Sequence, residues 1–115
     1  MEDEVSIRNS LASFLEDEGF NIFTASNGKD GINIILNNDV DCAIVDVRLP
    51  EMTGNDVIVR VCDEKPDMKF IIFTGSTNYY LPDTLLQLGI KNEDVLRKPI
   101  TDLNVILELL KSKLE

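Results

Sequence analysis

Five residues of types that do chemistry in proteins stand at or near expected strand ends: Glu2, Asp3, Asp46, Thr74 and Lys98. Glu2 and Asp3 precede the first predicted helix, where a preceding strand would end. Asp46 ends the apolar run 42–45, and Thr74 ends the run 70–73. Unbroken apolar runs indicate strands buried on both faces, as in parallel sheets flanked by helices. Because ligands in such folds bind beyond the carboxyl ends of the strands, we expect these side chains to gather at one edge of a sheet.

Three carboxylates, a hydroxyl and an ammonium at one edge suit the transfer of a phosphoryl group. Carboxylates about 4–5 Å apart repel by several kcal/mol in partly dry surroundings, so a hard divalent cation, Mg²⁺ in a cell, is expected to neutralise them. A carboxylate can attack phosphorus and form an acyl phosphate. A cation, a fixed ammonium and a hydroxyl then stabilise the phosphoryl oxygens. The alternative is that strand ends are polar because they meet water.

Helices and strands alternate along the chain that must position these residues. Apolar spacing, caps and helix stops predict helices over residues 5–18, after Asn27, after Thr53, from Pro82 to Gly89 and after Thr101. Strands are predicted at residues 22–25, 42–46, 70–74 and 95–96. Strict alternation over 115 residues predicts one α/β domain with right-handed crossovers. The series is unusual in opening with a helix.

The net charge of −10 and the lack of histidine limit the possible functions. The charge opposes binding to nucleic acid and anionic membranes, and its simplest role is solubility. Without histidine, imidazole catalysis and His-ligated metals are excluded. Cys42 and Cys62 lie in apolar runs and outside any CxxC pair, so we interpret them as small buried hydrophobic residues. Two free thiols are compatible with a reducing compartment. With no span-length apolar segment and no signal peptide, the predicted location is the cytoplasm.

Motifs around these residues resemble the receiver domain of two-component response regulators. Residues 46–54 (DVRLPEMTG) are similar to the family's phosphoacceptor signature, with Pro four residues after Asp, Met two residues later and Gly two further on. Residues 2–4 resemble the acidic pair that ends the family's first strand. Residues 73–75 resemble its hydroxyl-bearing strand end, and residues 97–99 its Lys-Pro pair. The resemblance covers the whole chain.

The resemblance implies a magnesium-dependent phosphoacceptor site. Asp46 would accept a phosphoryl group from a histidine kinase, a phosphotransfer protein or a small phosphodonor. Asp3 and Asp46 would be direct metal ligands, Glu2 would act through water, and the backbone carbonyl of Arg48 would complete the protein ligands. Such a domain is not an enzyme in the usual sense, although it catalyses its own phosphorylation and dephosphorylation.

The family also implies how the switch is read. Thr74 would hydrogen-bond a phosphoryl oxygen and move the following loop, and Lys98 would pair with another oxygen. The Lys98–Pro99 bond is typically cis. The fold is flavodoxin-like, a doubly wound parallel sheet of order 2-1-3-4-5 with helices on both faces. The implied partners are the kinase and a downstream protein target, with a homodimer as another option.

The first departure from the family is the lack of an apolar strand before the acidic pair, since only Met1 precedes Glu2. This strand is internal to the family's sheet, so its loss leaves backbone groups unpaired. We expect residues 1–115 to be a receiver domain truncated at its N-terminus or starting late. Otherwise a neighbouring molecule supplies the strand, or residues 22–25 pair directly with residues 42–46. The placement of Glu2 and Asp3 depends on which of these holds.

The second departure is Val95, which stands where receivers usually carry an aromatic switch residue three positions before the lysine. Residues 89–94 are also longer than the family pattern by about two residues. Val95 and Pro99 belong to the expected output region, so the output is predicted to be atypical. Tyr79 and Tyr80 are candidates to replace the aromatic residue, or are simply loop and core residues.

Two other functions are compatible with the same alternation of elements. One is an interaction module with a receiver fold and no working phosphorylation site, which the missing strand and Val95 favour. The other is a flavodoxin-like cofactor binder, which would need a phosphate-cradling loop that residues 2–4 do not provide. A phosphatase of the DxD type is disfavoured because Arg48 follows Asp46 by two residues. Because the chain ends after the last predicted helix, we expect a stand-alone receiver or a domain of a larger regulator.

Overall fold

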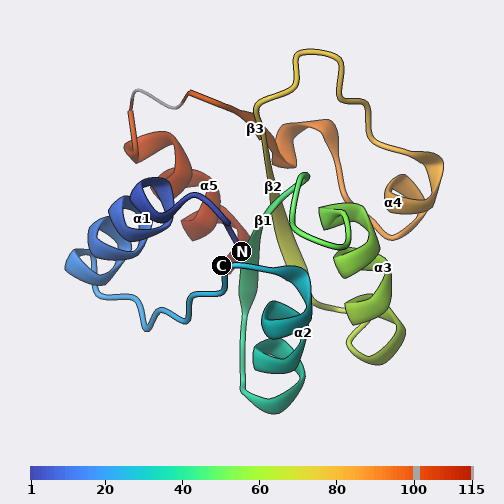
Figure 1. Cartoon of the computed structure of the whole chain (residues 1–115), viewed down its shortest axis with the longest axis horizontal. Helices are drawn as coiled ribbons and strands as arrows, with labels where there is room; N and C mark the ends of the chain where they lie inside the picture. Colours follow the sequence, from blue (N-terminus) through green and yellow to red (C-terminus); the bar gives the residue numbers. More distant parts are fainter. Residues whose placement is uncertain (100–101, 115) are drawn as a thin grey trace.

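The protein forms an α/β sandwich in which helices cover both faces of a parallel sheet. The computed structural model describes residues 1–99 and 102–114. In chain order the elements are α1 (Val5–Asp17), α2 (Gly28–Asn37), β1 (Cys42–Asp46), α3 (Gly54–Glu64), β2 (Lys69–Thr74), α4 (Asp83–Gln87), the 3₁₀ turn η1 (Asn92–Asp94), β3 (Val95–Arg97) and α5 (Asn104–Leu114). Figure 1 shows α1 and α5 on one side of the sheet, and α2 and α3 on the other.

The sheet of the described residues has the order β1-β2-β3, with all strands parallel. Alternate residues of β2 face opposite helical layers, as the period of two in a strand requires. Phe70 and Ile72 pack in a core cluster with α2 and α3, whereas Ile71 and Phe73 pack in clusters with α1 and α5. Both faces of β2 are therefore buried, which confirms the α/β sandwich expected from its unbroken apolar sequence.

Several predicted helix boundaries are confirmed by their local geometry. The Asn27 side chain accepts a hydrogen bond from the Asp30 amide at 2.8 Å. Thr53 and Asp56 form a reciprocal capping box at the start of α3. Gly19 and Gly89 follow α1 and α4 with positive φ values of 96° and 93°, conformations that glycine adopts at little cost. The predicted cap at Thr101 lies outside the described residues.

The predicted strand at residues 22–25 is wrong, because this segment is irregular. Direct pairing of the segment with β1 is wrong as well, since Met1 and Glu2 lie between them. The Met1 ammonium donates to the Ile44 carbonyl at 2.5 Å, and the Met1 carbonyl accepts from the Asp46 amide at 3.0 Å. On the other side, the Glu2 amide donates to the Ala25 carbonyl at 3.0 Å. Met1 and Glu2 thus pair like residues of a strand that lies between β1 and residues 22–25.

The start of α3 lies directly against the end of β1, because Gly54 permits a close backbone approach. The Gly54 amide donates to the Val47 carbonyl at 2.8 Å. A Cβ atom at Gly54 would lie 2.3 Å from the Asp46 carbonyl oxygen, closer than real Cβ contacts occur. The glycine therefore fixes how closely the loop that follows Asp46 folds back on the strand.

We predict that Gly54→Ala lowers the free energy of unfolding by about 1–3 kcal/mol, the usual cost of forcing extra atoms into a packed site. The cost arises because the Asp46 carbonyl belongs to the sheet and cannot move away cheaply. Urea denaturation of the variant and its parent measures it. Gly75→Ala is the matched control, because its Cβ would meet no described atom closer than 3.9 Å. Equal stabilities of the two variants would contradict this role for Gly54.

Candidate functional site

Asp46 lies buried at the carboxyl end of β1, as its position after an apolar run predicts. Its Oδ2 atom accepts a hydrogen bond from the Lys98 ammonium at 2.8 Å, and its Oδ1 atom accepts a longer one from the Arg48 amide at 3.3 Å. Its own amide is bonded to Met1. The carboxylate is thus held in one orientation at the edge of the sheet, partly shielded from water.

Lys98 brings together residues from three parts of the chain. Its Nζ atom lies 2.7 Å from Glu2 Oε1, 2.8 Å from Asp46 Oδ2 and 3.9 Å from Glu4 Oε1. It also stands 5.1 Å from the centre of the Phe73 ring, within the range of a cation–π interaction. Burial alone would lower the pKa of Lys98, but hydrogen bonds and attraction from Asp46 and Glu2 outweigh it and raise that pKa. The ammonium is therefore held in its charged form.

Glu2 is as deeply buried as Asp46, with 4% of its surface exposed against 5% for Asp46. Burial raises its pKa, against the opposing effect of Lys98. Its Oε2 atom accepts from the Glu4 amide at 3.1 Å. Its Oε1 atom is an ion-pair neighbour of Lys98 but accepts no well-aligned hydrogen bond. One buried oxygen thus retains capacity for a further positive partner.

Glu2, Asp3 and Asp46 form the acidic cluster predicted from the sequence. One carboxylate oxygen from each lies within 4.8 Å of the others, with Asp3 exposed and the other two buried. Hard oxygen ligands of this kind suit Mg²⁺, which keeps several waters and takes few carboxylates. The incompletely bonded Glu2 oxygen supports the same fit. The residues present could hold a divalent cation, although Lys98 already supplies part of the neutralising charge.

Thr74 ends β2 and is buried beside the site. Its hydroxyl accepts a hydrogen bond from the Ser76 amide at 3.0 Å, and its carbonyl accepts from the Lys98 amide at 2.7 Å. The hydroxyl therefore fixes the first turn of the following loop, while the backbone joins Thr74 to the strand that carries Lys98. The loop and the backbone of Lys98 are therefore both hydrogen-bonded to Thr74.

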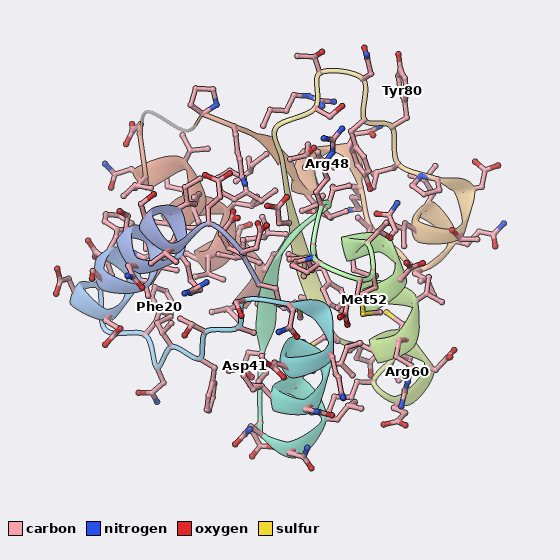
Figure 2. The ribbon with its side chains drawn as sticks, in the orientation of Figure 1. Phe20, Asp41, Arg48, Met52, Arg60 and Tyr80 are labelled. Carbon is pink, nitrogen blue, oxygen red and sulfur yellow. The ribbon has the colours of Figure 1, made fainter. Side chains whose placement is uncertain are left out.

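The proposed output residues occupy the far edge of the sheet. Val95 begins β3 and packs, half-buried, against the core cluster of α2 and α3. Pro99 is exposed, and the Lys98–Pro99 peptide bond is cis, as the resemblance implied. Tyr79 is half-buried with its hydroxyl bonded to Asn55 Oδ1 at 2.8 Å. Tyr80 is 84% exposed, and Figure 2 shows its side chain pointing away from the molecule.

Arg97 and Arg8 support the site but were missed by sequence reasoning. The Arg97 guanidinium donates to the carbonyls of Ser76 and Tyr79, at 2.8 and 3.2 Å, and so ties down the loop after Thr74. Arg8 donates to the Glu2 carbonyl at 3.0 Å. Their signals in the sequence were weak: Arg97 precedes the motif lysine, and Arg8 lies one helical turn after Glu4. The predicted ligand role of the Arg48 carbonyl stays a prediction.

Residues 1–111 match the family described as the response regulator receiver domain, so this chain belongs to that family. It is 29% identical over 109 residues to the response regulator SaeR of Staphylococcus aureus, which covers 95% of this chain and 46% of that protein. The chain thus spans about half the length of the curated relatives it matches. The whole-chain resemblance seen in the motifs is confirmed.

Solved structures support the same fold. A receiver domain protein of Methanospirillum hungatei, described as CheY-like, superposes with a TM-score of 0.86 at 29% identity, covering 98% of this chain and 88% of that one. TrrA of Thermotoga maritima, solved in complex with Mg²⁺ and BeF, gives a TM-score of 0.81 at 26% identity, with coverages of 97% and 93%. The family is that of two-component signalling and is not a class of conventional enzymes. No helix in the described part of the chain combines the length and apolar character of a membrane span.

The buried N-terminus predicts a pH-dependent stability. Burial lowers the pKa of the Met1 ammonium from its ordinary 8.0 to about 6. Between these values the unfolded chain binds more protons than the folded one, so the free energy of unfolding increases as the pH rises from 6 to 8. We expect a contribution of about 2 kcal/mol, at 1.36 kcal/mol per pKa unit. Urea titrations in EDTA measure it.

Protein acetylated on its N-terminus is the control for this prediction. Acetylation removes the titrating group, whereas the raised pKa of Glu2 affects both preparations. The chain has no histidine to titrate in the same window. The difference between the two curves therefore isolates the ammonium. Parallel curves would show that the Met1 ammonium is solvated in solution.

A second prediction concerns Lys98 as the resident cation. Lys98→Met leaves two buried carboxylates without their positive partner, and removing one member of a buried pair costs about 3–5 kcal/mol. We expect a lower thermal midpoint in EDTA, and a partial recovery on adding MgCl₂ that exceeds its effect on the parent, because a bound cation stabilises the folded state. Lys29→Met, on the exposed surface of α2, is the matched control. Equal midpoints for the two variants would contradict this role.

Proposed function

We propose that this receiver domain accepts a phosphoryl group on Asp46 and changes a protein-binding surface in response. The observation that carries the proposal is the buried Asp46 carboxylate, fixed by Lys98 on one side and adjoining the Glu2–Asp3 pair on the other. A carboxylate in this setting is oriented for attack and has a positive group ready for the charge that arrives. The phosphodonor is a histidine kinase, a phosphotransfer protein or a small phosphodonor.

In the transfer, an Asp46 carboxylate oxygen forms a bond to phosphorus while the bond from phosphorus to the donor's leaving atom breaks. The product is an acyl phosphate, and the donor leaves with the bonding electrons. Lys98 pairs with a phosphoryl oxygen, for which its ammonium already stands 2.8 Å from Asp46. The Thr74 hydroxyl donates to another oxygen. Both groups would stabilise the negative charge on the phosphoryl oxygens during the transfer.

Mg²⁺ would be held by Asp3 and Asp46 directly, by Glu2 through water and by the Arg48 carbonyl. When bound, it neutralises charge on the phosphoryl oxygens. Glu2 also forms an ion pair with Lys98, the same ammonium that pairs with Asp46. Because one ammonium is divided between two buried carboxylates, a new anion on Asp46 competes directly with Glu2 for it.

The structural response begins at Thr74. Its hydroxyl now accepts from the Ser76 amide, so a new bond to a phosphoryl oxygen shifts the loop that follows. Arg97 binds this loop at Ser76 and Tyr79 and lies next to Lys98. We propose that Arg97 and Tyr79 carry the shift to the surface at β3 and Pro99, where Val95 takes the place of the usual aromatic residue. A downstream protein reads that surface.

Residues 1–115 act in this proposal as one receiver domain. It works in the cytoplasm and makes no direct contact with nucleic acid, as its net charge of −10 favours. A second candidate function, an interaction module without phosphorylation, is favoured by Val95, which stands where receivers usually carry an aromatic residue. The two candidates differ in whether Asp46 is ever modified.

Mass spectrometry of the intact protein tests the proposal. Incubation with acetyl phosphate and MgCl₂ should add a single phosphoryl group to the parent and none to Asp46→Asn, which lacks the nucleophilic oxygen. Asp63→Asn, on the exposed surface of α3, is the matched control and should be phosphorylated like the parent. Phosphorylation of Asp46→Asn would sink the assignment of the nucleophile. A folded parent that stays unmodified would favour the interaction module.

A further inference from the structure

The β2–α4 loop, which we define as residues 75–82, is fastened to the rest of the molecule from two sides (Figure 1). From β3, the Arg97 guanidinium donates hydrogen bonds to the carbonyls of Ser76 and Tyr79. From α3, the Asn55 side chain accepts a hydrogen bond from the Tyr79 hydroxyl at 2.8 Å. Tyr79 is therefore held twice, by its carbonyl toward β3 and by its hydroxyl toward α3.

The two attachments of Tyr79 differ in how far they can follow a loop that moves. Arg97 is exposed and has a long side chain with many rotamers, so its guanidinium can move with the carbonyls that it binds. The Tyr79 side chain has only two torsions and packs against the core cluster of α2 and α3. Asn55 stands in the first turn of α3, which lies tightly against the Asp46 carbonyl at Gly54. The bond from Tyr79 to Asn55 thus joins the loop to a rigid part of the site.

The hydrogen bond between Tyr79 and Asn55 has a fixed direction and a measurable strength. Burial raises the pKa of the Tyr79 hydroxyl above its ordinary value of 10.0, so the hydroxyl is a neutral donor at physiological pH. The amide oxygen of Asn55 is the acceptor. Removing one such bond typically changes a conformational equilibrium by about two- to tenfold. The bond is therefore strong enough to influence a switch and weak enough to be broken by one.

A short chain of contacts connects Tyr79 with the hydroxyl of Thr74. The Thr74 hydroxyl accepts from the Ser76 amide at 3.0 Å, and the Ser76 hydroxyl accepts from the Asn78 amide at 3.2 Å. Asn78 is next to Tyr79 in the chain, so these bonds make residues 74–79 one connected segment. In the proposed function, Thr74 turns to a phosphoryl oxygen and shifts this segment. Asn55 belongs to α3 and does not shift with it.

We propose that Tyr79 and Asn55 are positioning residues that hold the β2–α4 loop in the position of the unphosphorylated protein, and that their hydrogen bond breaks when Asp46 carries a phosphoryl group. The proposal rests on the proposed function, because the phosphoryl group at Asp46 causes the shift. A bond made in only one of two states favours that state and opposes the change to the other. The chain thus has an aromatic residue that controls the switch from the β2–α4 loop, although position 95 is a valine.

Titration with beryllium fluoride, a mimic of the phosphoryl group, tests the proposal. BeCl₂ is added to the protein in NaF and MgCl₂, and the bound fraction is measured from the NMR signal of the Ser76 amide. Tyr79→Phe removes only the hydroxyl and should bind beryllium fluoride about two- to tenfold more tightly than the parent, because the resting position is less favoured. A merely structural role of the bond would lower the thermal midpoint without tightening binding. Tyr80→Phe is the matched control, since Tyr80 is 84% exposed, and should bind like the parent.

Variants of Asn55 assign the effect to this one hydrogen bond. Asn55→Ala removes the acceptor and should tighten the binding of beryllium fluoride by the same factor as Tyr79→Phe. The double variant should bind no more tightly than either single variant, because both changes remove the same bond and their effects are not additive. Asn33→Ala, on the exposed surface of α2, is the matched control for Asn55→Ala and should bind like the parent.

Tyrosine fluorescence follows the release of Tyr79 directly. The chain has two tyrosines and no tryptophan, so Tyr79 is the only tyrosine in the Tyr80→Phe variant. Its emission and its quenching by acrylamide should change when beryllium fluoride binds, because the hydroxyl loses Asn55 and becomes accessible. The same variant with Asp46→Asn should show no change, since the phosphoryl mimic has no carboxylate to bind.

Two results would overturn the proposal while the proposed function stands. One is equal affinity of Tyr79→Phe and the parent for beryllium fluoride, and the other is Tyr79 emission that stays constant as beryllium fluoride binds. A folded parent that neither binds beryllium fluoride nor is phosphorylated by acetyl phosphate would contradict the proposed function and this proposal together. Mass spectrometry of the parent therefore distinguishes the two kinds of failure.

Discussion

The arrangement depends on one ammonium that holds two buried carboxylates of like charge together. Glu2 and Asp46 come from the first residues of the chain and from the end of β1, and each lies within 2.8 Å of Lys98 Nζ. In partly dry surroundings their mutual repulsion would drive them apart. Because Lys98 bonds through its backbone to Thr74, the cation is fixed to the sheet, and the carboxylates are fixed through it. Because Lys98 already neutralises part of the negative charge, the site attracts a further cation less strongly than three free carboxylates would.

Tight backbone packing surrounds this charged cluster. Gly54 brings the start of α3 against the Asp46 carbonyl, while Met1 holds the Asp46 amide from the other side. Asp46 therefore has little freedom to move, and a change in its charge must be taken up by its neighbours. Those neighbours are the Lys98 ammonium and the Thr74 hydroxyl. The Thr74 hydroxyl is bonded to Ser76, which lies in a surface loop, and loops are in general more mobile than strands. Rigidity at the carboxylate and adaptability in the loop are complementary properties of a switch.

Much of the fold and the site could be predicted because local signals decide them. Asp46 and Thr74 follow unbroken apolar runs, and Asn27 and Thr53 cap helices by contacts within three residues. The irregular course of residues 22–25 could not be predicted, because an apolar segment forms a strand only where the edge of another strand pairs with it, and this depends on the tertiary structure. The burial of Glu2 and the support from Arg8 also depend on where α1 docks. That docking is a tertiary property without a local sequence signal.

The backbone position of Met1 and the charged site are directly linked. Met1 and Glu2 are adjacent, so whatever fixes the backbone of Met1 between β1 and Ala25 also fixes the Glu2 carboxylate beside Lys98. Met1 is held by two backbone hydrogen bonds to β1 and by packing of its side chain over Gly31, and the Glu2 amide adds a bond to Ala25. The way in which Glu2 and Asp46 share one ammonium is therefore set in part by the backbone bonds of Met1 and Glu2.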